Sequence, residues 1–511
     1  MGNFSQLSIT LFSILIYFSG GLVSLQAQII LSPENGALGG GGTAYITGYE
    51  ALFVNPANLF IKEKPGRIEI GLAGFGALTE PVLRASGLQN QSNNFQDMFS
   101  PFKPSVAHQD IFTAERLDII SRNFPGERLR SQHLFRFETY WLGVKWNTPN
   151  RSYALALRTR AGGRFVTGRG FYSGEPVIKN ELQVIDRSIV SQFQTLHELS
   201  FGFAESFTFL NGLSPRLSEV IIGIAPKFVV GGSFQSVKYT NVFTRAESGP
   251  WDRTLGYEQL TTGDFTDATN SFLATGDPQA AINQNMNFSD FFSPTGFGAG
   301  LDFGLTFLLP LGEDISTIQR LETETRKSLR ISFSVTDIGF ISYTDRAQKN
   351  TIDEREEIAN ELEPLANSVF RGIPGQFLPF LNESSEHPLF ESESNDDNFS
   401  TILPTAMHTG VLLQLNRLKV MGDLSLGITN NAINTTKLIT FIGAELRPFR
   451  FLPVRAGTRL ATETPEYYSF GFGIETNRFE LNTSIQLRTR SGGPTGELAG
   501  LSVGSLKIYL P

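Results

Sequence analysis

The feature that most constrains this chain is a strictly alternating run of twelve residues near its C-terminus, Phe479–Arg490. Apolar residues and Thr occupy one face and polar or charged residues the other, which is the period of a β-strand. Strands in soluble proteins are usually about 5–6 residues long, whereas a tilted strand that crosses a bilayer needs about 9–11. The run is therefore long enough to cross a membrane.

Similar segments recur along most of the chain. We predict fourteen strands, at residues 67–76, 133–146, 152–162, 195–210, 218–234, 296–308, 328–341, 406–416, 419–429, 437–447, 454–460, 467–476, 479–490 and 499–510. Longer and shorter connections between them alternate without a break, as in outer-membrane barrels with short periplasmic turns and long outer loops. The pattern predicts an all-β fold: a transmembrane antiparallel β-barrel of about fourteen strands over residues 67–511, with long extracellular loops.

The composition agrees with a barrel in the outer membrane. Only 18% of the residues are charged, because a lipid-facing surface must be apolar and charge is confined to lumen and loops. The net charge of −8 excludes a protein that binds nucleic acid through a basic face. The absence of Cys from the sequence excludes disulfides and thiolate metal sites. Outer-membrane lipid is the expected surroundings.

Three segments are expected to lie outside the strand pattern. Residues 1–27 have the apolar core and small cleavage residue of a signal peptide, with an uncleaved membrane anchor as the alternative. Residues 28–66 form a separate N-terminal segment ahead of the barrel. Within the insertion 342–405, the acidic stretch 351–371 predicts a short helix, since acidic residues favour a helix N-terminus.

Two motifs in the N-terminal segment carry backbone constraints. Gly39, Gly40, Gly41 and Gly42 would let the chain approach a wall closely. In Asn55-Pro56-Ala57, Pro56 forces Asn55 toward an extended conformation, and the Asn side chain can bond backbone groups of a turn. An ordinary Asn-Pro turn before a strand is the alternative interpretation.

Charged residues on the polar face of the predicted strands, or near strand starts, are candidates to line the lumen. They are Arg158, Arg160, Glu198, Glu205, Arg330, Glu445, Arg455, Arg459, Glu475, Glu480 and Arg488. A conducting pore would place one sign of charge at a constriction. The mixed signs favour salt-bridged packing around a plug instead. Aromatic pairs such as Tyr140-Trp141 and Tyr467-Tyr468 suit interfacial girdles or are simply good strand formers.

Motifs of enzymes and cofactor sites lack their required context. Gly500-Leu-Ser-Val-Gly504 matches a nucleophile elbow, but it lies in the last predicted strand and no His follows it. Gly39–Ala44 fits a dinucleotide fingerprint without the βαβ unit that it needs. The five His show no metal-ligand spacing. We therefore predict no catalysis, no cofactor and no metal site.

The passage from Ala37 to Leu59, with its Gly-rich stretch and Asn55-Pro56-Ala57, resembles the plug region of FadL-type and PorV-type outer-membrane barrels. His197–Ala204, Val335–Ile341 and Leu403-Pro404-Thr405 are similar to other parts of that superfamily. The resemblance implies fourteen strands and an N-terminal plug that includes the glycines and the Asn-Pro-Ala triplet.

Two functions are expected from this resemblance. A FadL-like barrel would bind or transport hydrophobic small molecules across the outer membrane. A PorV-like barrel would instead scaffold secretion-system or surface proteins without transport. A soluble exported all-β adhesin is a third alternative that needs no membrane.

Overall fold

A computed structural model describes the barrel and the segment that precedes it. The described residues are 30–64, 67–79, 120, 124, 126–171, 173, 175–207, 219–247, 249–275, 284–285, 293–311, 327–358, 398–434, 436–461, 466–490 and 493–510. The predicted signal peptide, residues 1–27, lies outside them.

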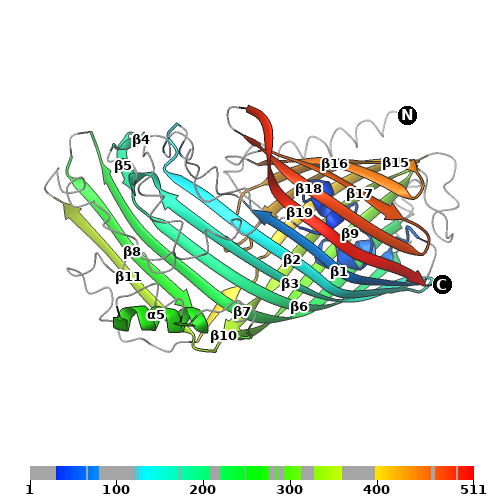
Figure 1. Cartoon of the computed structure of the whole chain (residues 1–511), viewed down its shortest axis with the longest axis horizontal. Coiled ribbons are helices and arrows are strands. Elements are labelled where there is room, and N and C mark those ends of the chain that lie inside the picture. The colour runs from blue at the N-terminus through cyan, green and yellow to red at the C-terminus, as the bar shows by residue number, and fades with distance from the viewer. Residues whose placement is uncertain are drawn as a thin grey trace.

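Fourteen antiparallel strands of the described residues form a closed ring (Figure 1). In ring order they are β1 (Ile68–Thr79), β2 (Arg130–Asn147), β3 (Arg151–Gly168), β6 (Ile189–Phe207), β7 (Glu219–Arg245), β9 (Gly296–Pro310), β10 (Lys327–Tyr343), β13 (Ala406–Leu415), β14 (Leu418–Gly427), β15 (Ile439–Phe449), β16 (Leu452–Ala461), β17 (Tyr467–Glu475), β18 (Phe479–Arg490) and β19 (Gly493–Leu510). The ring closes because β19 pairs with β1 from Ile68↔Leu510 to Leu78↔Gly500. The predicted barrel is confirmed, and each predicted strand overlaps an observed one.

Several strands continue past the ring on the side of the long connections. The strand β7 runs for 27 residues, and its far end pairs with β8 (Trp251–Thr261) and β5 (Leu182–Asp186). The short β4 (Val177–Lys179) pairs with β5, and β12 (Phe399–Ile402) pairs with β10. A helix, α5 (Asp264–Thr275), follows β8. The connections on this side therefore carry ordered structure that the sequence did not predict.

The acidic helix predicted at 351–371 is wrong for its first part. Residues up to Ile358 belong to β11 (Gln348–Ile358), which pairs along its whole length with β8. The neighbouring strand β8 offers partners to the backbone groups along one edge of this stretch, and such tertiary pairing overrides a local helix preference. The remainder of the predicted helix lies outside the described residues.

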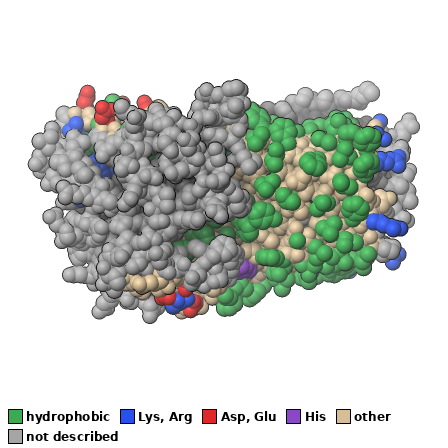
Figure 2. Space-filling model, in the orientation of Figure 1, with side chains coloured by type: hydrophobic (Ala, Val, Ile, Leu, Met, Phe, Trp, Pro, Cys, Tyr) green, Lys and Arg blue, Asp and Glu red, His purple; other side chains and the backbone are tan. Residues whose placement is uncertain are grey.

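The outer face of the ring is apolar. Along β17, Phe470 and Phe472 are 50% and 58% exposed. Tyr467 and Ser469, which point to the other face of the strand, are buried. Figure 2 shows hydrophobic side chains spread over the half of the barrel that ends in the short turns. A closed barrel with such a belt is an outer-membrane protein. Among the described residues, no helix is long and apolar enough to span a bilayer.

The girdle interpretation of the aromatic pairs is half wrong. Trp141 and Tyr468 are exposed on the outer face, but their neighbours Tyr140 and Tyr467 are buried inside. Consecutive residues of a strand point to opposite faces, so a sequential pair cannot place both rings at the lipid interface.

The N-terminal segment, residues 30–64, lies inside the ring at its short-turn end (Figure 1). It contains α2 (Pro33–Ala37) and two 3-10 helices, η1 (Tyr49–Phe53) and η2 (Pro56–Phe60). The helix α2 packs against β16 to β19, whereas η2 packs against β6, β7 and β9 on the other side. Its apolar residues and those of the inner wall form the main hydrophobic core.

The apolar outer face of the ring allows a test of whether Phe470 faces lipid. Replacing Phe470 by Arg is expected to destabilise the folded barrel by about 2–4 kcal/mol, because it places a charge in hydrocarbon. Phe470→Leu serves as the control and should cost much less. Urea unfolding of the barrel refolded into vesicles measures both, and equal stabilities of the two variants would contradict the assignment.

Candidate functional site

The Asn55-Pro56-Ala57 triplet docks on the inner wall at β9. Asn55 is extended (φ −155°) and its Oδ1 accepts a hydrogen bond from Ala57 N at 3.2 Å. Its Nδ2 donates to Thr306 Oγ1 at 2.9 Å. A Cβ at Gly304 would lie 2.0 Å from Asn55 Oδ1, so the wall must be glycine where the triplet touches it.

The four glycines lie where the segment meets another part of the wall, at β14 and β16. Gly39 adopts φ +88°, and a Cβ there would lie 2.8 Å from the backbone oxygen of Thr458 on β16. The amide of Gly42 donates to the carboxylate of Asp423 on β14 at 3.1 Å. Gly40 N donates to Asn35 O, and Gly41 O accepts from Asn35 Nδ2. Gly39 and Gly42 therefore approach the wall closely, whereas these hydrogen bonds of Gly40 and Gly41 lie within the segment.

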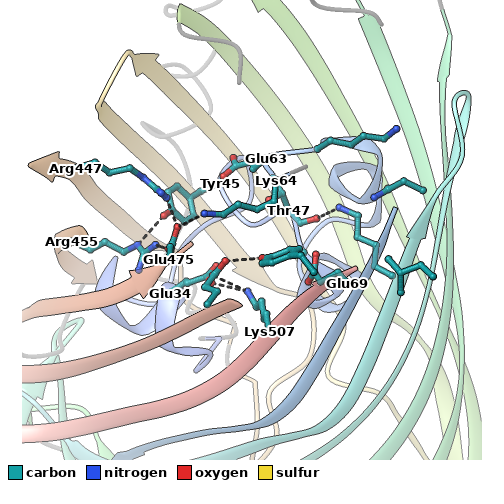
Figure 3. A pocket seen from close by; sticks show the side chains of 17 residues that line it. Glu34, Tyr45, Thr47, Glu63, Lys64, Glu69, Arg447, Arg455, Glu475 and Lys507 are labelled. Atoms are coloured by element: carbon teal, nitrogen blue, oxygen red, sulfur yellow. Dashed lines mark hydrogen bonds and ion pairs between the residues drawn. The ribbon is translucent and has the colours of Figure 1, made fainter. Parts of the chain in front are cut away.

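A cluster of ion pairs lines part of the short-turn mouth of the lumen (Figure 3). Arg455 Nε lies 2.8 Å from Glu445 Oε2, and the same guanidinium bonds Glu475. Tyr45 of the N-terminal segment donates its hydroxyl to Glu445 and accepts from Arg455 Nε. Burial, with smaller contributions from neighbouring carboxylates, raises the pKa of Tyr45 well above its ordinary value. A polar cavity of about 40 Å³ lies between these groups and Lys62, Lys64 and Lys145.

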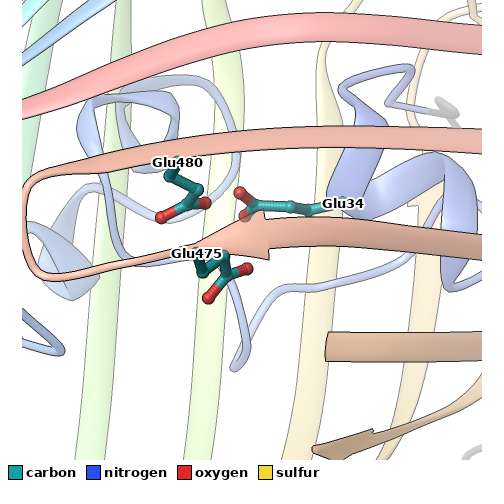
Figure 4. A group of neighbouring side chains, drawn as sticks. All are labelled: Glu34, Glu475 and Glu480. Atoms are coloured by element: carbon teal, nitrogen blue, oxygen red, sulfur yellow. The ribbon is translucent and has the colours of Figure 1, made fainter. Parts of the chain in front are cut away.

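Three buried carboxylates meet at one edge of this mouth. Oxygens of Glu34, Glu475 and Glu480 lie within 4.8 Å of one another (Figure 4), a spacing that could hold a metal ion. Lys507 Nζ lies 2.7 Å from Glu34 and 3.5 Å from Glu480, and Arg455 pairs with Glu475. Protein cations therefore already neutralise the group.

Glu63 ties the end of the N-terminal segment to two strands. Its carboxylate lies 2.9 Å from Lys419 Nζ on β14 and 3.2 Å from Arg330 Nη1 on β10. Burial alone would raise the pKa of Glu63, but the charges of Lys419 and Arg330 lower it well below its usual range. The ionised form thus stabilises the docked segment.

Midway along the lumen, three basic and three acidic side chains form a layer across one side of the inner wall. This charged layer consists of Arg158, Arg160, Glu198, Lys227, Asp302 and Asp337, all with side chains at most 1% exposed. Arg158 Nη2 lies 2.6 Å from Glu198 Oε2, and Arg160 pairs with both Glu198 and Asp337. Lys227 Nζ lies 2.6 Å from Asp302 and 2.7 Å from Asp337. Arg158 also stacks over Phe53 of the N-terminal segment at 4.0 Å.

The three passages that resembled the superfamily meet at this layer. His197–Ala204 supplies Glu198, and Val335–Ile341 supplies Asp337, which has φ +59° at a bulge between Val335 and Ile338. Leu403 N donates to Gly339 O at 3.0 Å, and Thr405 Oγ1 donates to Asp337 O at 2.7 Å. Sequence reasoning missed Lys227, Asp302 and Asp337. The first two lie on the inward parity of their strands, a signal that could have found them, but no pattern predicts the positive φ of Asp337.

Beyond the charged layer, toward the long connections, the inner wall turns apolar. We call this set the inner apolar cluster: Leu196, Val229, Phe234, Ile341, Tyr343, Ala347, Phe399, Leu403 and Ile433. The ring of Phe234 lies 4.8 Å from that of Tyr343 and 5.6 Å from that of Phe399. Ile433 lies on the connection between β14 and β15, and a Cβ at Gly162 on β3 would come within 2.9 Å of its side chain. This connection therefore reaches across the lumen and covers the cluster.

The remaining candidates have separate environments. Arg459 is buried and stacks over Tyr467 at 3.6 Å, and Arg488 is buried on the inner face of β18. Glu205 was wrongly assigned to the lumen, because it has the opposite parity to Glu198 and pairs with Arg151 at the short-turn rim. Ser502 lies within β19 and not at a strand-to-helix turn, so the nucleophile-elbow geometry is missing there.

The environment of Glu63 predicts a pH-dependent attachment. Because its folded pKa is depressed, its stabilisation is present above the usual carboxyl pKa of 4.5 and is lost as the pH falls toward the folded value. Glu63→Gln should weaken docking of the N-terminal segment by about 1–3 kcal/mol at neutral pH. The measurement is the rate of proteolysis within residues 30–64 of the purified barrel.

The ratio of this rate between Glu63→Gln and the unmodified protein should shrink as the pH is lowered to about 3. Lys62→Gln, at an exposed neighbouring position, is the control and should behave like the unmodified protein. A ratio near one at neutral pH would refute the role of Glu63.

The chain is similar to solved outer-membrane proteins at low sequence identity. The Pseudomonas putida toluene transporter TodX matches with 12% identity and a TM-score of 0.40, over 95% of this chain and 98% of that chain. A Pseudomonas aeruginosa FadL homologue matches with 11% identity and a TM-score of 0.38, over 95% and 98%. No curated protein matches the chain. Residues 76–487, most of the sequence, match the family described as "Family of unknown function (DUF5723)", and the chain belongs to this family.

Proposed function

We propose that this outer-membrane barrel binds a hydrophobic small molecule on its inner apolar cluster and passes it across the membrane. The observation that carries the proposal is the cluster itself. A water-filled barrel has a polar interior, whereas here Phe234, Tyr343 and Phe399 pack together on the inner wall. Aromatic and aliphatic walls with few polar groups are typical of sites for apolar ligands.

The cover over the cluster supports a route from the long-connection side. Ile433 is held by a turn in which Asn431 Oδ1 accepts from the amides of Ile433 at 3.0 Å and Asn434 at 2.7 Å. Asn434 Nδ2 donates to Thr405 O at 2.7 Å. The bonds of Asn431 lie within the turn and would move with it, whereas the bond of Asn434 joins the turn to the wall and is worth about 0.5–1.5 kcal/mol. The connection could thus move aside at modest cost to admit a ligand.

The charged layer argues against straight passage along the barrel axis. An apolar molecule would have to separate buried ion pairs, and leaving one buried charge without its partner costs about 3–5 kcal/mol. The N-terminal segment then blocks the short-turn half. Exit would require movement of that segment or a sideways gap in the wall, and the layer favours the sideways route.

Substitution in the cluster tests the proposal. Phe234→Ser removes aromatic contact area from the expected site and should lower uptake of labelled fatty acid or hydrocarbon roughly tenfold in a deletion strain that carries the variant. Phe265→Ser is the control. Phe265 of α5 is equally buried, but it packs against Phe193, on the opposite face of β6 from the cluster.

Heat-modifiable gel migration must first show that both variants form closed barrels. Uptake that is unchanged by deletion of the protein, across several fatty acids and hydrocarbons, would reject transport. An equal loss of uptake in both variants would reject the inner apolar cluster as the site.

A non-transporting scaffold for secretion or surface proteins is the second candidate. The observation in its favour is the sheet that β7, β8 and β11 extend past the ring, where β11 pairs with β8 alone among the described strands. An unpaired strand edge can accept a partner's strand. Crosslinking in outer membranes followed by isolation of the barrel separates the two candidates, since only the scaffold requires a stable protein partner.

A further inference from the structure

The rim of the barrel at the end with the short turns carries exposed basic side chains before β1 and between consecutive strands. We call it the short-turn rim. Arg67 precedes β1, Arg417 lies between β13 and β14, Arg450 lies between β15 and β16, and Arg478 lies between β17 and β18. All four are exposed, as are Arg151 at the start of β3 and Lys327 at the start of β10. Figure 2 shows Lys and Arg, and no acidic side chain, at this end of the visible face.

Exposed apolar side chains flank most of these basic residues. Phe449 and Phe451, on either side of Arg450, are 59% and 50% exposed, and their rings stack at 5.7 Å. The other flanking residues are Ile68 beside Arg67, Leu415 and Leu418 around Arg417, and Phe479 beside Arg478, each more than a third exposed. They continue the lipid-facing belt, so the basic groups lie where hydrocarbon gives way to head groups.

Four described carboxylates of this end face the inside of the barrel. Glu34, Glu445, Glu475 and Glu480 are buried in the lumen and paired there. Of the basic rim residues, Arg151 pairs with Glu205, and Arg417 donates to Pro448 O. Within the described residues Arg67, Arg450 and Arg478 have no carboxylate partner. Among the described residues, the outward-facing charges of the rim are therefore mainly basic, although the whole chain has a net charge of −8.

We propose that this rim binds the phosphate groups of anionic phospholipids in the membrane leaflet that it borders. A guanidinium matches the geometry of a phosphate through two parallel hydrogen bonds. Basic residues near a charged lipid surface contribute about 1 kcal/mol each, and the effect falls off within a Debye length. The flanking Phe and Leu side chains anchor in the acyl region and fix the height of each guanidinium. This inference is independent of what the lumen carries.

The test compares two triple variants of the full chain. Arg417→Gln, Arg450→Gln and Arg478→Gln together neutralise the rim. Lys179→Gln, Lys238→Gln and Lys349→Gln remove the same charge at the opposite end, on β4, β7 and β11. Each barrel is placed in nanodiscs of phosphatidylcholine with phosphatidylglycerol, and the lipids it retains are counted by native mass spectrometry at low and high salt.

The unmodified barrel and the opposite-end variant should retain phosphatidylglycerol over phosphatidylcholine, and salt should weaken this preference. The rim variant should lose it by a factor on the order of 100. Unchanged heat-modifiable migration shows that each variant is folded. Equal retention of both lipids by the unmodified barrel, an equal loss in both variants, or displacement of the lipid by inorganic phosphate at matched concentration would overturn the proposal.

Discussion

Everything in this structure depends on the need of backbone N–H and C=O groups for partners inside hydrocarbon. An unsatisfied group there costs several kcal/mol, so a membrane-spanning sheet has to close on itself. The pairing of β19 with β1 meets this need, and it joins the two ends of the sequence that forms the wall. Closure also creates a problem, because a ring of fourteen strands is wider than the roughly eight-stranded barrel that wall side chains can fill alone. The N-terminal segment supplies the missing interior.

How that segment is attached follows from the dielectric inside the wall. Buried charges are tolerated only in pairs, and here the wall and the segment provide the partners for one another. Lys507 of β19 binds Glu34 and Glu50, and Glu63 binds Lys419 and Arg330. Such contacts are directional and fix the position of the segment more strictly than apolar packing alone. Some of the mixed charges that line the lumen therefore attach the segment, whereas those of the charged layer pair strands of the wall with one another. The charges do not form a one-sign selectivity filter.

The sequence predicts the wall well because a single physical rule governs it. Lipid on one side and a polar interior on the other impose a period of two over about ten residues. Most of the strands follow that rule, and irregularities interrupt it in β1, β2 and β10. The rule of a period of two no longer applies to segments that lie beyond the lipid. The far half of β7 and the stretch that forms β11 lie past the belt, so local composition suggested a loop and a helix there. The wrong assignment of Glu205 to the lumen is also a local error. Glu205 is one residue out of phase with the inward-facing residues of its strand, which include Glu198. The positive φ of Asp337 arises from a bulge, which is set by three strands together and leaves no periodic trace.

The bulge at Asp337 bears on the route of the proposed ligand. The ladder between β10 and β13 ends at Thr336↔Ala406, and pairing with β12 resumes at Phe340↔Ile402. Between these points the wall is joined by two hydrogen bonds, from Leu403 N and Thr405 Oγ1. Breaking them costs about 0.5–1.5 kcal/mol each, against about 3–5 kcal/mol to remove one partner from a buried ion pair of the charged layer. The inner apolar cluster contains Leu403 itself, so it adjoins this weak point directly. For an apolar molecule on that cluster, a step sideways between β10 and β13 toward lipid is therefore less costly than a step along the axis.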